Sequence, residues 1–195
     1  MKKLFALAMA AFLAAQTADA APYKIDQSHA IVGFKVTHMV VSKTAGKFNE
    51  FDATFEFDPD NLDKSSVMAT IQAGSIDTNN EKRDGHLKSG DFFDVENTPT
   101  ITFSSSNIVK DGDSYIAHGN LTLRGVTKHV ELPFAVTGPI SDPYGNGRLG
   151  VEAKLTINRQ EFGVSWSKTM DTGGLVVSDD VHIEIDAEFV HKKAE

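Results

Sequence analysis

Residues 115–136 read YIAHGNLTLRGVTKHVELPFAV, and they divide into two arms around a glycine-containing turn. On both arms apolar residues alternate with mostly polar ones, and a period of two is typical of a β-strand whose two faces differ. With the turn placed at residues 124–127, the arms form a hairpin with one apolar face. Pro133 lacks a backbone donor, which indicates an edge, a bulge or a weakly paired stretch there. A lone hairpin is marginally stable, so its apolar face must join more sheet.

The same alternation recurs in six other segments of the chain. These are residues 30–38, 46–57, 67–73, 100–105, 149–157 and 181–189. With the hairpin they make eight strands, and closing an antiparallel sheet into a barrel removes both exposed edges. We therefore predict an all-β fold, an eight-stranded antiparallel β-barrel, and leave a two-sheet sandwich open as the alternative.

One short helix is predicted near residues 79–89. Thr78 and Glu81 have the spacing of a capping box, in which the two side chains satisfy free backbone donors at a helix start. Gly90 follows as a stop signal.

The first twenty residues have the pattern of a secretory signal peptide. Lys2 and Lys3 precede an apolar run, and small residues flank Asp19 where a signal peptidase would cut. The apolar run is shorter than the roughly 20 residues that a membrane-spanning helix needs, which disfavours an uncleaved anchor. We expect residues 1–20 to be removed, residues 21–195 to form a single domain, and the protein to be periplasmic.

Charge and cysteine content narrow the class of partner. Without residues 1–20 the chain has 17 basic and 26 acidic residues, a formal charge of -9, and such a surface repels nucleic acid. The sequence has no Cys, so thiol chemistry and attachment of lipid through a Cys are excluded. The domain must be held together by its hydrophobic core.

The inward face of the predicted barrel combines large apolar residues with many small ones. The outward positions carry charges, the reverse of an outer-membrane barrel, whose outer face meets lipid. The small inward residues are Ala53, Ala69, Ala73, Ala117, Gly119, Ala153 and Ala187. They either leave a carbon-lined lumen or fit the taper of a fully filled barrel, since eight strands allow both. A lumen of this kind suits an alkyl or prenyl chain, because each buried CH2 contributes about 0.8 kcal/mol.

The sequence gives weaker indications of a catalytic or metal site than of a lumen. The seven His residues form no recognised metal-binding motif, and we predict no metal site and no cofactor. A turn at residues 124–127 would pair residue 118 with about residue 133, so His118 and His129 should not meet. Arg83, Asp84 and His86, near Asp91, could perform acid–base chemistry as a hydrolase or isomerase site. Ion pairing and helix capping at one end of the barrel is the simpler interpretation.

Four blocks of the sequence resemble the YceI-like proteins, a family of exported bacterial lipid-binding barrels. They are residues 23–29 (YKIDQSH), 75–93 (with SIDT, RDGHL and DFF), 99–103 (PTITF) and 119–128 (GNLTLRGVTK). The match extends over essentially all of residues 21–195. His129 is a departure, since the family often has Pro after the Thr-Lys pair, and the region around residues 39–47 varies in such proteins.

The resemblance implies a lipocalin-like barrel that holds a polyisoprenoid or another long-chain amphiphilic lipid, with no catalytic residues. By this analogy the ligand-binding residues are Val32, Phe34, Val36, His38, Phe55, Ile71, Phe92, Phe93, Phe103, Leu121, Leu123, Phe134, Val151 and Trp166. No nucleic acid and no transmembrane segment are expected, and a homodimer is left open. A barrel without a ligand, acting as a stress-related interaction module, is a third hypothesis beside the carrier and the enzyme.

Overall fold

The computed structural model describes residues 22–171 and 173–193. The predicted signal peptide, residues 1–20, lies outside these described residues. Within them, no helix combines the length and the apolar character needed to cross a membrane.

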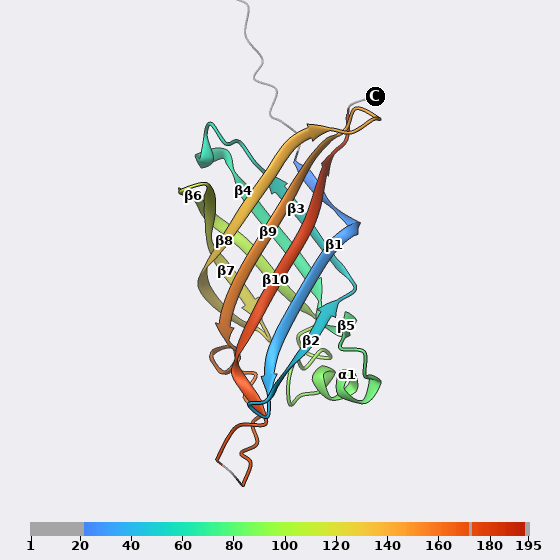
Figure 1. Ribbon diagram of the computed structural model, residues 1–195, viewed down its shortest axis with the longest axis vertical. Coiled ribbons are helices and arrows are strands. Elements are labelled where there is room, and N and C mark those ends of the chain that lie inside the picture. Colours follow the sequence, from blue (N-terminus) through green and yellow to red (C-terminus); the bar gives the residue numbers. More distant parts are fainter. Residues whose placement is uncertain (1–21, 172, 194–195) are drawn as a thin grey trace, which may run out of the picture.

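The strands form one antiparallel sheet that closes on itself (Figure 1). In chain order they are β1 (Tyr23–His38), β2 (Ser42–Phe48), β3 (Phe51–Glu56), β4 (Ser66–Gln72), β5 (Ile76–Asp77), β6 (Thr100–Asp111), β7 (Ser114–Leu123), β8 (Val126–Ser141), β9 (Gly147–Asn158) and β10 (Val177–His191). Short 3-10 turns lie at Leu62–Lys64, Ala73–Ser75 and Arg159–Phe162.

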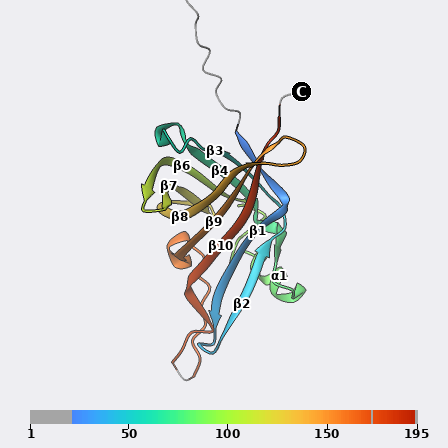
Figure 2. The same cartoon turned by 45° about the horizontal axis from the view of Figure 1, so that its top comes forward.

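Closure comes from pairing of the first strand with the last. β1 pairs with β10 from Lys24 to His38, and both Figure 1 and Figure 2 show the two strands side by side. β2 and β3 lie one after the other along β1, and β5 continues the line of β4, so the ten segments make eight strand positions. The predicted eight-stranded antiparallel barrel is confirmed, and the sandwich alternative is wrong.

The β7–β8 hairpin has a tighter turn than the sequence predicted. Leu123 pairs with Val126, so the loop is only Arg124 and Gly125, which both have positive φ (49° and 72°). This pattern is that of a two-residue hairpin loop, which shifts the register by two residues from the predicted one. The rings of His118 and His129 therefore stack with their centroids 6.1 Å apart, and the prediction that they would not meet is wrong.

Pro133 marks a change in the pairing of β8. The ladder between β8 and β9 begins at Phe134, so the preceding residues of β8 pair with β7 alone. Of the three possibilities for Pro133, a local edge is the one observed, since this stretch of β8 has a neighbouring strand on one side only.

The helix α1 (Glu81–Lys88) lies at one end of the barrel (Figure 1). Its N-cap is Asn80, whose side chain accepts a hydrogen bond from the backbone N–H of Arg83 at 3.0 Å. The capping box predicted from Thr78 is wrong, because Thr78 lies two residues before the N-cap. Its hydroxyl instead donates to Asp84 at 2.5 Å.

Aromatic residues fill one end of the barrel. Phe55 is fully buried and its ring meets those of Phe134 and Phe189 edge to face, with centroids 5.9 and 5.7 Å apart. We call Phe55, Phe134 and Phe189 the aromatic plug and this end the plug end. The opposite end, where β1 turns into β2 at residues 39–41, is the tip end.

Truncation of the plug should destabilise the fold strongly. We expect Phe55→Ala to lower the free energy of unfolding by about 3–5 kcal/mol, because a buried ring is lost and a void remains. Ile31→Ala, at an exposed outward position of β1, should change it by less than about 0.5 kcal/mol. Equilibrium denaturation in urea measures both, and equal effects would show that the plug is not part of the core.

Candidate functional site

A cavity of about 430 Å³ lies inside the barrel. Its lining begins at the aromatic plug and reaches Val36, His38, Thr44 and Val176 beside the tip end. Nearly all of the lining is carbon, and the volume falls within the roughly 300–1,000 Å³ of small-molecule sites. The arrangement can hold an apolar chain along the barrel axis.

All fourteen residues predicted to bind a ligand lie along this cavity. They are Val32, Phe34, Val36, His38, Phe55, Ile71, Phe92, Phe93, Phe103, Leu121, Leu123, Phe134, Val151 and Trp166. Several are only partly buried although they point inward, because they border the cavity. That they bind a ligand stays a prediction.

The small inward residues divide into two groups. Ala53, Ala69, Ala117 and Ala153 line the cavity, whereas Ala73, Gly119 and Ala187 do not. At Gly119 a Cβ would lie 2.7 Å from the Phe103 ring and 2.5 Å from the backbone oxygen of Ser104, so this glycine allows close approach of β6. The expectation that small residues leave room therefore applies to the first group only.

Other residues of the lining were not in the predicted site. On β10, Val181, Ile183 and Ile185 border the cavity, and so do Ile25 and Phe48. The alternation of β10 had already placed its three residues inward, so the sequence signal existed for them.

Arg159 is a buried polar residue on the lining that the sequence did not indicate. Its guanidinium donates to the backbone oxygens of Val164 and Trp166, both at 2.7 Å, and of Ser178 at 2.9 Å. It also pairs with Asp179 at 3.0 Å. Burial lowers the pKa of Arg159, and the charge of Asp179 opposes this change. These bonds fasten the segment after β9 over the barrel, with Trp166 against the cavity.

The charged cluster at α1 is bonded within itself. Arg83 donates to the Thr78 hydroxyl and to the Thr78 backbone oxygen, each at 2.7 Å, and Asp84 accepts from the Thr78 N–H and hydroxyl. His86 contacts Asp91 at 2.9 Å and meets Trp166 edge to face at 5.5 Å. Arg83 and His86 thus border the cavity while they hold α1 against the barrel end.

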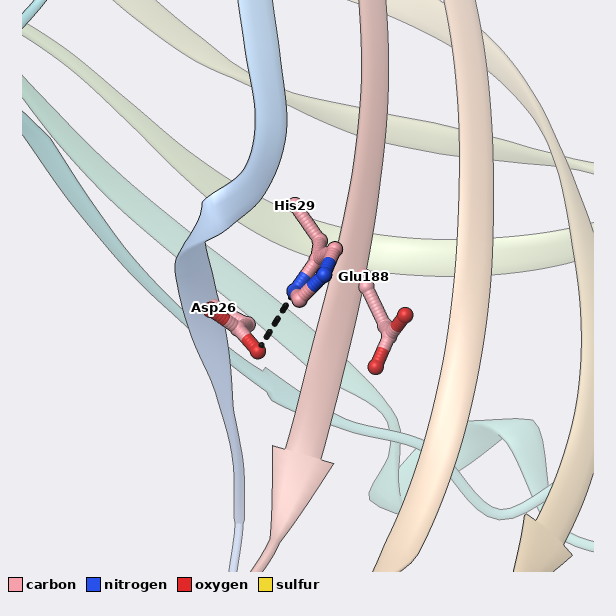
Figure 3. A group of neighbouring side chains, drawn as sticks. All are labelled: Asp26, His29 and Glu188. Atoms are coloured by element: carbon pink, nitrogen blue, oxygen red, sulfur yellow. Dashed lines mark hydrogen bonds and ion pairs between the residues drawn. The ribbon is translucent and has the colours of Figure 1, made fainter. Parts of the chain in front are cut away.

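A second polar cluster lies on the outside of the barrel, where β1 bulges away from β10. Figure 3 shows Asp26 and His29 on β1 beside Glu188 on β10. Among the described residues this is the one group of three side chains whose potential metal-ligating atoms all lie within 4.8 Å of one another. Arg148 on β9 supplies the positive charge for these carboxylates, because it pairs with Glu188 and with Asp26 (Nη1–Oδ2 3.4 Å). Asp26, His29, Arg148 and Glu188 therefore link β1, β9 and β10 on the outside of the barrel, and we call this cluster the external staple.

Comparison with known proteins identifies the family. The model of the YceI-like domain matches residues 23–189, most of the chain. The chain belongs to the YceI-like family. A UPF0312 protein of Pectobacterium atrosepticum is 42% identical over 195 residues, with 98% of each chain covered.

Solved structures agree with the barrel. BcnA of Burkholderia cenocepacia superposes with a TM-score of 0.75 at 27% identity, covering 84% of this chain and 98% of that one. A domain of Saccharophagus degradans, named as polyisoprenoid-binding, gives a TM-score of 0.64 at 14% identity and covers 87% of this chain and 98% of that one. At that identity the second likeness concerns the fold alone. The resemblance seen in the sequence is confirmed as membership of the YceI-like family.

The external staple of this YceI-like barrel makes its stability dependent on pH. Hydrogen bonds from Ser28, and next from His29, hold the pKa of Asp26 far below its usual value. The ionised carboxylate therefore stabilises the folded state at pH values above about 4, where an unfolded Asp is also ionised. This contribution is lost as the pH falls below that value toward the lowered pKa.

We expect Asp26→Asn to lower the free energy of unfolding by about 1 kcal/mol at pH 7, since a charged acceptor is replaced by a neutral one. The difference from the parent protein should shrink between about pH 4 and the acid limit of folding. Denaturation curves at several pH values measure it, with Asp113→Asn in the exposed β6–β7 turn as the control. A difference that stays constant down to the acid limit would contradict the role given to Asp26.

Proposed function

We propose that this protein is a periplasmic carrier that holds one polyisoprenoid, or another long-chain amphiphilic lipid, inside the barrel. The observation that carries the proposal is the carbon-lined cavity of about 430 Å³ between the aromatic plug and the tip end. Burial of a ten-carbon stretch there would contribute on the order of 8 kcal/mol before the entropy of ordering the chain is subtracted. Binding of this kind needs no chemical step.

The cavity also suggests how an amphiphile would be oriented. The plug end offers only rings and aliphatic groups, whereas Thr78, Arg83 and His86 border the cavity near α1. An apolar chain would point toward Phe55 and Phe134, and its polar group would lie toward the charged cluster.

Two further observations support the carrier role. A domain with the same fold is named as polyisoprenoid-binding, so this barrel type accommodates such a chain. The signal-peptide pattern of residues 1–20 supports export. The alternative of a hydrolase or isomerase at Arg83, Asp84 and His86 gains no support from the geometry, because Thr78 engages both Arg83 and Asp84.

A substitution that fills the lumen tests the proposal. Ala69 borders the cavity, and its neighbour Met68 on the same strand points outward with 57% of its surface exposed. Ala69→Phe should displace several CH2 groups of the ligand, each contributing about 0.8 kcal/mol, and weaken binding at least about tenfold. Met68→Phe should leave binding unchanged.

The measurement is a fluorescence titration of detergent-free protein with a polyprenol and a fatty acid, each labelled at its polar end. Circular dichroism establishes that each variant is folded, and Ala69→Leu serves if the larger side chain prevents folding. A folded Ala69→Phe protein that binds both probes as the parent does would overturn a lumen site.

A further inference from the structure

The turn between β1 and β2 exposes three consecutive apolar side chains. Met39, Val40 and Val41 have 42%, 69% and 85% of their surface exposed. Tight turns usually carry Gly, Asn, Asp or Ser, and a run of exposed apolar residues is unfavourable unless it has a function. We call these three residues the apolar tip.

The backbone of the apolar tip is also unfavourable for its residues. Met39 and Val40 have φ angles of 50° and 64°, in the left-handed region. A β-branched residue such as Val is a genuine outlier there, and Gly, Asn or Asp is the usual choice at such a position. The tip thus keeps large apolar side chains at positions where backbone conformation favours small polar ones, and such outliers cluster at functional sites.

A second segment supports the tip from the side. The Met39 N–H donates to the backbone oxygen of Val176 at 2.9 Å. A Cβ at Gly174 would lie 2.9 Å from the Met170 methyl group and 3.2 Å from the Val40 side chain. In Figure 1 the turn and the segment before β10 project together beyond the barrel at the same end.

The parts of β1 and β2 that enter and leave the apolar tip carry basic residues and no acidic ones, although the protein is acidic. Residues 33–48 contain Lys35, Lys43 and Lys47 and no Asp or Glu. Lys35 pairs with Glu184 at 2.6 Å, and Lys47 lies farther along β2, opposite Asp77 of β5 in the strand ladder. Lys43, two residues beyond Val41, and Lys168 in the neighbouring segment are exposed. Asp171 is the acidic residue on that segment, and Asp180 is an exposed acidic residue near the start of β10. In a chain with a net charge of -8, an acid-free stretch at an apolar turn is a local reversal.

We propose that the apolar tip docks into the surface of an anionic phospholipid bilayer. Apolar side chains that enter the boundary between head groups and acyl chains, with Lys beside them on anionic lipid, are the mode of binding of interfacial proteins. The acid-free stretch around the tip favours an anionic bilayer over a second copy of this chain, because two tips in contact would bring the Lys43 side chains of both copies together.

Docking at the tip would also place the cavity against the bilayer. Val36, His38, Thr44 and Val176 line the cavity and lie directly beside the tip. A lipid could then pass between bilayer and barrel with little exposure to water. This last step rests on the proposed carrier function, whereas docking itself does not.

Flotation of the protein with extruded vesicles tests the docking. We expect the parent protein to bind phosphatidylglycerol vesicles at least tenfold more tightly than phosphatidylcholine vesicles, and to lose this preference at high salt. Val41→Asp should weaken binding to the anionic vesicles at least tenfold. It leaves the two left-handed residues unchanged, so the turn should keep its shape.

The matched control lies at the other end of the barrel. Ile140 on β8 is 63% exposed, and Ile140→Asp adds the same charge away from the tip, so it should bind vesicles as the parent does. Lys43→Glu should weaken binding to the anionic vesicles while its secondary structure is retained.

Three outcomes would overturn the docking. They are no binding of the parent protein to anionic vesicles, parent-like binding by Val41→Asp, and equal loss in Val41→Asp and Ile140→Asp. If sedimentation shows a dimer that Val41→Asp dissociates, and no vesicle binding, the tip is a contact between two copies instead. Ala69→Phe separates the two proposals, because it should lose lipid capture in the lumen and retain vesicle binding.

Discussion

Pairing between β1 and β10 is the interaction on which the rest of the structure depends. It joins the first strand to the last, so neither terminal strand is left as an open edge of the sheet. The pairing is interrupted between Ile25 and Ala30, where β1 bulges. At that point Arg148 bridges Asp26 on β1 and Glu188 on β10. The external staple thus joins the two strands where their backbone pairing is interrupted between Ile25 and Ala30.

Closure of the barrel encloses an interior, and how side chains fill that interior is the second constraint on the structure. The plug end is filled by Phe55, Phe134 and Phe189, and the part toward the tip end is left with a carbon-lined cavity. Side chains around an empty space lack packing partners, which costs stability. An apolar ligand would restore those contacts and stabilise the folded state in proportion to its concentration and affinity. The carbon-lined cavity thus both limits the packing of the interior and would give the barrel affinity for lipid.

The strands and the inward residues of the barrel could be predicted from the sequence, because side chains along a strand alternate between the two faces with a period of two. The alternation placed Val32, Phe34 and Val36 on one face, and the structure places them on the cavity. Features set by a single turn or by tertiary contacts were not accessible. The loop at Arg124 and Gly125 changed the register of the hairpin, and Asn80 rather than Thr78 capped α1.

The burial of Arg159 is another feature that could not be predicted from the sequence. Nothing in its sequence neighbourhood distinguishes it from a surface arginine, and its burial depends on backbone oxygens that only the folded segment after β9 brings together. The exposed turn at residues 39–41 is the reverse case, because its apolar residues contradict local turn preferences. Such a conflict points to a role that lies outside the fold itself.

Native mass spectrometry of the protein, isolated without detergent from the compartment where it accumulates, tests the carrier account most directly. We expect a discrete added mass that solvent extraction releases as a prenyl or fatty chain. Incubation of the stripped protein with an isoprenoid quinone or a fatty amide should restore a mass of this kind. A mass equal to that of the protein alone, unchanged after both incubations, would contradict the carrier function. It would mean that the cavity between the aromatic plug and the tip end does not hold lipid.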